Sequence, residues 1–269
     1  MDNSEQHESG VRALFAALAT ADSDETALAR FAAVLADPGG DASGERLRRL
    51  WPPPASPADP TAALVADPPR RPVPPLRPRD PALERAIATA SACVGRLESV
   101  DSGSVTPLAT AWLVRPDLAV TIRKPLLPCL AQLTRGERTL QIDLPGDAPV
   151  AVREVVYVAP DCDLALLRVA TRPSFIAFAP GVAHGHELAA IDCDDSPAPP
   201  HGEALPGGLR LVPGRVQEVS AALLRHDCAG RPGGVLLDLA SAQAIGLTLG
   251  DHRSVPGWLV RERLERLNR

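Results

Sequence analysis

The sequence predicts a mainly β protein that ends in a helix and begins with a small helical segment and a proline-rich linker. Three observations predict this class. Short apolar runs separated by Pro and Gly turns recur from residue 93 to residue 249, as they do in all-β barrels and sandwiches. Twelve of the 29 prolines lie between Pro52 and Pro81. Before them, apolar residues recur every three or four positions, which is the spacing of an amphipathic helix.

Composition restricts the classes of function. Hydrophobic residues make up 45% of the 269 residues, which is enough for a core. The net charge is −5 and aromatic residues make up 3%, so the chain lacks the positive charge and the stacking side chains that nucleic-acid binding uses. No apolar run reaches the roughly 18 residues of a membrane-spanning helix, and the start MDNSEQHES does not resemble a secretory signal. We expect a cytoplasmic protein that binds neither nucleic acid nor membrane.

Residues 1–51 are predicted to form a small helical module. Apolar side chains at helical spacing mark three stretches: Val11, Leu14, Phe15 and Leu18; Leu28, Phe31, Val34 and Leu35; and Leu47, Leu50 and Trp51. A segment this short buries only a thin core, and no catalytic pattern accompanies it. We expect the module to dock on a protein partner; the alternative is that its helices pack on the main domain.

Residues 52–81 are predicted to form an extended linker. Each proline fixes its own φ, lacks an N–H donor and disfavours helix at the preceding residue. The segment is therefore expected to act as a semi-rigid spacer. The alternative is a PxxP-type ligand for a partner domain.

Residues 82–269 are predicted to form the β domain. After a helix expected over 82–90, ten short apolar runs are expected to be strands: 93–97, 109–114, 118–121, 139–142, 150–158, 164–169, 187–191, 209–219, 235–237 and 244–249. Because no helical pattern interrupts the runs, they favour a barrel or a sandwich.

The chain ends in a predicted amphipathic helix over 258–267. Val260, Leu264 and Leu267 form its apolar face, and Arg263 and Arg266 lie on the opposite, polar face.

The sequence offers no cofactor motif and no clear metal site. The cysteines are widely spaced without a CxxC pair, which predicts reduced thiols without structural zinc; they are Cys93, Cys129, Cys162, Cys193 and Cys228. His184 and His186 have the residue types of a metal site together with the residues that follow them, Asp192, Cys193, Asp194 and Asp195. The preferred interpretation is an exposed hairpin that turns at Gly185. We expect neither metal nor cofactor.

Several motifs of the β domain occur in a fixed order. They are the strand 109–114 (ATAWLV), the turn and strand 116–121 (PDLAVT), the segment 161–167 (DCDLALL), and the strand pair 235–238 and 244–247. In this order, and with a helix at the end, they resemble the trypsin-like (chymotrypsin-fold) serine proteases over residues 90–267. The resemblance implies a trypsin-like double β-barrel, in which an active site lies between two six-stranded barrels.

The resemblance implies an Asp, a His and a Ser in that active site. Asp163 matches the aspartate, but Lys124 stands at the position of the histidine, three residues after Thr121. A lysine ammonium has no lone pair and, with an ordinary pKa of about 10.4, does not act as a base at pH 7. We expect Lys124 to form a structural ion pair with Asp163 instead.

The nucleophile position is also changed. Where the family's loop reads G-x-S-G-[SG]-P, this chain has Gly230, Arg231, Pro232, Gly233 and Gly234, and the loop is about three residues shorter than usual. Pro232 stands at the position of the serine. Proline has neither a hydroxyl nor a backbone N–H, so it neither attacks a substrate nor contributes to an oxyanion hole. These changes imply an inactive centre.

An alternative nucleophile lies close by. Cys228 is four residues before Pro232 and two residues after His226, and a thiolate paired with an imidazole is a nucleophile. In a strand, however, the two side chains share a face without the loop geometry that presents a nucleophile.

We therefore expect an inactive homologue of trypsin-like proteases, a pseudo-protease, that binds a protein or peptide as a scaffold or adaptor, for example in bacterial signalling or defence. We expect the cleft between the two barrels to hold an extended peptide by strand addition, which uses backbone groups rather than a triad. The alternatives are a working peptidase with a non-standard nucleophile and a purely structural β domain.

Overall fold

The computed structural model describes residues 80–193 and 202–267. The helical module predicted in residues 1–51 and nearly all of the predicted linker lie outside the described residues. The described chain begins with helix α4 (Pro81–Ser91), where the sequence predicted a helix. Asp80 caps this helix by accepting a hydrogen bond of 2.9 Å from the N–H of Ala82. Pro81 suits the first turn, because an N–H has no helical partner there.

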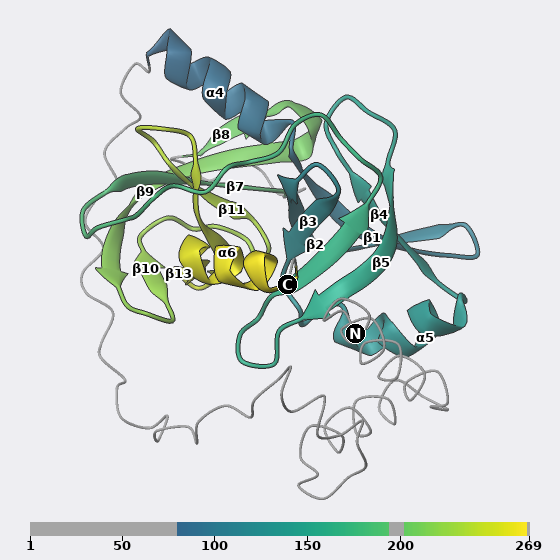
Figure 1. Ribbon diagram of the computed structural model, residues 1–269. Coiled ribbons are helices and arrows are strands. Elements are labelled where there is room, and N and C mark those ends of the chain that lie inside the picture. The colour runs from purple at the N-terminus through teal and green to yellow at the C-terminus, as the bar shows by residue number, and fades with distance from the viewer. Residues whose placement is uncertain (1–79, 194–201, 268–269) are drawn as a thin grey trace, which may run out of the picture.

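The first barrel has six antiparallel strands in the order β1-β2-β3-β6-β5-β4, and it closes because β1 pairs with both β2 and β4 (Figure 1). The strands are β1 (Val94–Asp101), β2 (Ser104–Arg115), β3 (Leu118–Thr121), β4 (Thr139–Asp143), β5 (Val150–Val158) and β6 (Ala165–Val169). A short 3₁₀-helix (Leu127–Cys129) and helix α5 (Leu130–Arg135) connect β3 to β4.

The second barrel also has six strands, in the order β7-β9-β10-β13-β12-β11. It closes because the long strand β9 pairs with β7 through residues 209–215 and with β10 through its last residues. A seventh strand, β8, pairs with the start of β9. These strands are β7 (Glu187–Cys193), β8 (Glu203–Leu205), β9 (Leu209–Val219), β10 (Leu224–His226), β11 (Val235–Asp238), β12 (Ala244–Gly250) and β13 (Arg253–Pro256).

The predicted strands and the double barrel are confirmed. Each of the ten apolar runs forms a strand, whereas β8, β10, β13 and α5 were not predicted. One large hydrophobic cluster extends across both barrels; it includes Leu97 and Trp112 of the first barrel and Ile191 and Leu211 of the second. Trp112 is fully buried, and its ring lies 5.8 Å from that of Phe178 between centroids. A second, smaller cluster around Leu236 belongs to the second barrel alone. The larger cluster therefore joins the two barrels.

Helix α6 (Gly257–Arg266) packs against β12 and β13 and also contacts the first barrel (Figure 1). Leu264 is buried as predicted, but Arg263, which was predicted to lie on the polar face, is buried too. The reason is an ion pair of 2.5 Å between its guanidinium and Asp161. Arg115 of β2 adds a hydrogen bond of 3.3 Å to the carbonyl of Leu264. None of the described helices, α6 included, is both long and apolar enough to cross a membrane.

Candidate functional site

Lys124 and Asp163 lie together in the first barrel. Strands β3 and β6 pair Thr121 with Ala165, so the residues that follow β3 meet those that precede β6. The backbone N–H of Lys124 donates a hydrogen bond of 2.9 Å to Oδ1 of Asp163, and its Nζ lies 3.8 Å from Oδ2. The expected pair therefore forms, mainly through the backbone N–H. The Lys124 side chain is 77% exposed, so this ion pair contributes little to stability.

Among the described residues, the hydrogen bond and the ion pair of Asp163 do not involve an imidazole. Its carboxylate accepts a hydrogen bond from a backbone N–H and pairs with an ammonium, which has no lone pair to accept a proton. Lys124 consequently does not act as the general base that serine proteolysis needs.

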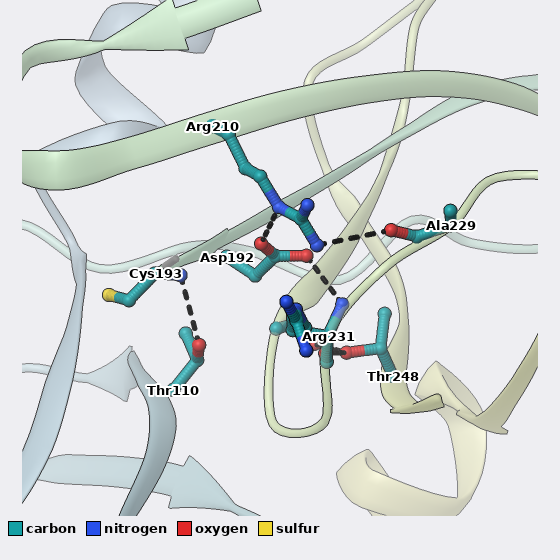
Figure 2. A network of polar contacts seen from close by, with 8 residues as sticks. Thr110, Asp192, Cys193, Arg210, Ala229, Arg231 and Thr248 are labelled. Atoms are coloured by element: carbon teal, nitrogen blue, oxygen red, sulfur yellow. Dashed lines mark hydrogen bonds and ion pairs between the residues drawn. The ribbon is translucent and has the colours of Figure 1, made fainter. Parts of the chain in front are cut away.

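The loop between β10 and β11 turns its backbone donors inward (Figure 2). The N–H of Arg231 donates to Oδ2 of Asp192 at 2.6 Å, and the N–H of Gly233 donates to the carbonyl of Thr248 at 2.8 Å. Pro232 lies between them, exposed and without an N–H. An oxyanion hole needs two N–H groups that point at one empty position, and this loop does not provide them.

A buried ion pair stands behind the loop (Figure 2). Asp192 of β7 is completely buried and accepts a hydrogen bond of 2.5 Å from Nε of Arg210 on β9. The two residues face each other because the strand register pairs them. Nη2 of Arg210 also donates to the carbonyl of Ala229 at 3.2 Å. Sequence analysis missed this pair, because only the register places residues 18 positions apart side by side.

The remaining loop glycines, Gly230 and Gly234, lie where the backbone approaches β7. A Cβ on Gly230 would lie 3.0 Å from the Cβ of Ala190, and a Cβ on Gly234 would lie 2.7 Å from the carbonyl oxygen of Ile191. Larger residues would push the loop away from the strand.

The loop and the Lys124–Asp163 corner are connected through two threonines. The N–H of Thr110 on β2 donates to the carbonyl of Pro232 at 3.4 Å. The carbonyl of Thr110 accepts a hydrogen bond of 2.8 Å from the hydroxyl of Thr121, three residues before Lys124. Hydrogen bonds thus connect the segments of the first barrel that carry Lys124 and Asp163 with the segment of the second barrel that carries Pro232.

Cys228 and His226 touch each other, but inside the second barrel. The Sγ of Cys228 lies 3.0 Å from Nδ1 of His226, whose Nε2 lies 2.9 Å from the hydroxyl of Ser254. Their exposed fractions are 1% and 2%. Burial raises the pKa of the Cys228 thiol and lowers the pKa of His226 to about 4, because it disfavours both charged forms. At neutral pH the pair is a thiol and a neutral imidazole.

The other cysteines give no nucleophile either. Burial raises the pKa of Cys93 to about 11 and those of Cys162 and Cys193 to about 12. No disulfide joins the five cysteines, all of which lie in the described part of the chain. A reactive cysteine needs a lowered pKa and access to solvent.

His184 and His186 lie far from Asp192 and Cys193, whereas Asp194 and Asp195 lie outside the described residues. The two histidines flank the turn at Gly185 before β7, whereas Asp192 and Cys193 lie at the other end of this strand. Six residues of strand span about 20 Å. Within residues 80–193 and 202–267, no three His, Cys, Asp or Glu side chains gather to hold a metal ion.

Comparison with known proteins rests on structure. The sequence matches no protein-family model and no curated protein. Among solved structures, an inactive form of Rv3671c from M. tuberculosis H37Rv is 20% identical, with 73% of this chain and 97% of that chain covered and a TM-score of 0.48. Deg5 is 17% identical, with 69% and 95% covered and a TM-score of 0.50. The HtrA-type protease AlgW with a decapeptide is 15% identical, with 69% and 67% covered and a TM-score of 0.53.

At these identities the likeness concerns the fold. The two six-stranded barrels and the helix that follows them agree with what the resemblance implied. The chain therefore has the double β-barrel fold of the trypsin-like serine proteases.

Proposed function

We propose that this protein is a catalytically inactive homologue of the trypsin-like serine proteases that binds a protein or peptide partner. The observation that carries the proposal is the loop at Pro232, which has no hydroxyl and whose neighbouring N–H groups are hydrogen-bonded within the protein. Neither attack on a carbonyl nor stabilisation of an oxyanion is available from such a loop.

The change at Lys124 supports the same proposal. Loss of a single triad member lowers kcat by roughly 10⁴-fold or more in comparable enzymes. In this chain Lys124 stands at the position of the base and Pro232 at the position of the nucleophile. Lys124 does not accept the proton, and Pro232 has no hydroxyl to attack the substrate.

Binding does not need these residues. A double-barrel protein holds an extended peptide by adding it to a sheet edge, through main-chain hydrogen bonds and side-chain pockets. We propose that the chain acts as a scaffold or adaptor, with residues 1–51 as a second docking element and with bacterial signalling or defence as the setting.

The test separates binding from cleavage. The full chain is incubated with a library of extended peptides and with casein, and with a fluorophosphonate probe for activated serines. We expect saturable binding of a subset of peptides, each recovered intact by mass spectrometry, and no labelling by the probe. Peptide fragments or a labelled residue would overturn the inactive assignment, and the absence of any bound peptide would overturn the peptide-binding role.

The second candidate is a peptidase that uses Cys228. The contact of 3.0 Å between its Sγ and Nδ1 of His226 favours it, whereas the burial of both residues opposes it. Iodoacetamide distinguishes the two candidates. We expect Cys228 of the folded chain to resist alkylation, and rapid alkylation with loss of a hydrolytic activity would establish the peptidase.

A further inference from the structure

We propose that residues 229–234, together with Thr110, form a clamp that fixes the second barrel against the first. This inference does not depend on the partner or on the proposed function. It concerns what the loop does now that it lacks a nucleophile.

Thr110 is the part of the clamp that belongs to the first barrel. It lies on β2, is buried, and uses three polar atoms. Its N–H donates to the carbonyl of Pro232 at 3.4 Å, and its hydroxyl accepts a hydrogen bond of 3.0 Å from the N–H of Cys193 at the end of β7. Its carbonyl accepts the hydroxyl of Thr121 within the first barrel. Thr110 therefore joins two segments of the second barrel to the wall of the first.

Gly233 brings the loop into direct backbone contact with Thr110. Its φ is +88°, and a Cβ at this position would lie 2.1 Å from the carbonyl oxygen of Thr110 and 3.1 Å from its nitrogen. Real Cβ atoms do not approach other atoms as closely as 2.1 Å. The two barrels therefore meet here without space for a side chain.

Hydrogen bonds from other residues of the second barrel also fix the loop (Figure 2). Asp192 binds the N–H of Arg231, and its partner Arg210 binds the carbonyl of Ala229. On the other side, Thr248 accepts the N–H of Gly233 and donates its hydroxyl to the carbonyl of Arg231. A loop conformation with outward N–H groups would have to break hydrogen bonds to a buried ion pair, which is costly.

Two consequences follow from this geometry. The loop contributes to the stability of the joint between the barrels. In addition, a serine and a histidine at the degenerate positions do not restore catalysis, because the loop that carries them stays closed.

The first consequence is tested with a matched pair of glycine variants, Gly233→Ala and Gly103→Ala. Both glycines have a positive φ, +88° and +85°, but nothing lies within 4 Å of a Cβ at Gly103. The backbone strain that alanine introduces is thus similar at the two positions. The difference in Tm between the two variants therefore reports the contact with Thr110. Thermal unfolding and amide hydrogen exchange of the full chain are measured. We expect a larger decrease in Tm for Gly233→Ala, and at least about tenfold faster exchange at Thr110 and Cys193; equal effects of the two variants would overturn the clamp.

A milder variant keeps the test decisive if Gly233→Ala does not fold. Thr110→Val removes only the hydroxyl that accepts the N–H of Cys193, and Thr106→Val on the exposed part of the same strand is its control. We expect faster exchange at Cys193 in Thr110→Val alone. Unchanged exchange at Cys193 would contradict the clamp.

The second consequence is tested with the double variant Lys124→His/Pro232→Ser and the fluorophosphonate probe. We expect no labelling, as for the wild-type chain. Labelling of the double variant alone would overturn the clamp, whereas labelling of the wild-type chain would overturn the proposed function. The two failures are therefore distinguishable.

Discussion

Asp192 connects the loop at Pro232 to Arg210 of β9. It is fully buried, and it binds both the guanidinium of Arg210 and the N–H of Arg231. Breaking a buried ion pair leaves an uncompensated charge and costs about 3 kcal/mol or more. We expect Asp192→Asn to lower the free energy of unfolding by about this amount in urea titrations.

The matched control for this prediction is Asp147→Asn. Asp147 also binds an arginine, Arg172, at 2.9 Å, but its side chain is 60% exposed. Exposed ion pairs contribute about 1 kcal/mol or less. Similar losses for the two variants would mean that burial does not set the strength of the Asp192 pair.

His226 predicts a pH dependence of stability. Burial lowers its pKa in the folded protein from 6.5 to about 4. Between these values the unfolded chain binds a proton that the folded chain does not, so the stability present above pH 6.5 decreases as the pH falls to 4, by about 3 kcal/mol in total.

The measurement is urea unfolding between pH 7 and pH 4 for the wild-type chain and for His226→Gln. We expect the variant to show a weaker pH dependence in this range. His184→Gln, which changes an exposed imidazole, should behave like the wild type. If His226→Gln retains the full pH dependence, other groups cause it.

For single residues, the sequence predicted those contacts that follow from local motifs. Lys124 and Asp163 were expected to meet, because each lies beside a strand whose motif was recognisable. The partners of Asp192 and Arg263 were not foreseen. Both bind residues that are distant in sequence, and only strand register or helix docking brings these together.

Among the elements, the apolar run decided which were predicted. Each of the ten predicted strands holds a visible run of apolar residues, whereas the short strands β8, β10 and β13 do not. In such short strands, hydrogen bonds to neighbouring strands set the conformation. The strand that closes the second barrel, β10, was therefore beyond what the sequence pattern indicates.

The docking of α6 gives a prediction at the element scale. Arg263 is buried and binds Asp161 at 2.5 Å, so this helix is joined to the first barrel by a partly buried ion pair. We expect Arg263→Ala to lower the free energy of unfolding by about 2 kcal/mol, because it removes both the pair and the packing of the side-chain stem. Thermal unfolding measures this loss.

The control lies one turn away. Arg266 is 55% exposed and pairs with Glu262 within the helix, so Arg266→Ala is expected to change stability by less than about 0.5 kcal/mol. Equal shifts in Tm would indicate that the contact between Arg263 and Asp161 does not hold the helix.

For the whole molecule, the order of motifs predicted more than any single motif did. A strand, a turn, an aspartate segment and a later strand pair imply two barrels only as a series. The series did not reveal that the loop at Pro232 is closed, because this depends on Asp192 and Arg210, which no motif includes, and on contacts of Thr110 that its motif does not indicate. The departures from the family's motifs at Lys124 and Pro232 were visible in the sequence; the packing of the loop was not.

The hydrophobic cluster to which both barrels contribute predicts that they unfold in one transition. Residues of both barrels pack in this cluster, and both the clamp and α6 add polar contacts across the boundary. Trp112 reports on the first barrel and Trp258, in α6, on the second. In a Trp51→Phe background, the variants Trp112→Phe and Trp258→Phe each leave one reporter. For each variant, we expect the urea midpoint by fluorescence to equal the midpoint by far-UV circular dichroism. Different midpoints within one variant would mean that the barrels unfold separately, and that the contacts at Thr110 and Asp161 do not couple them.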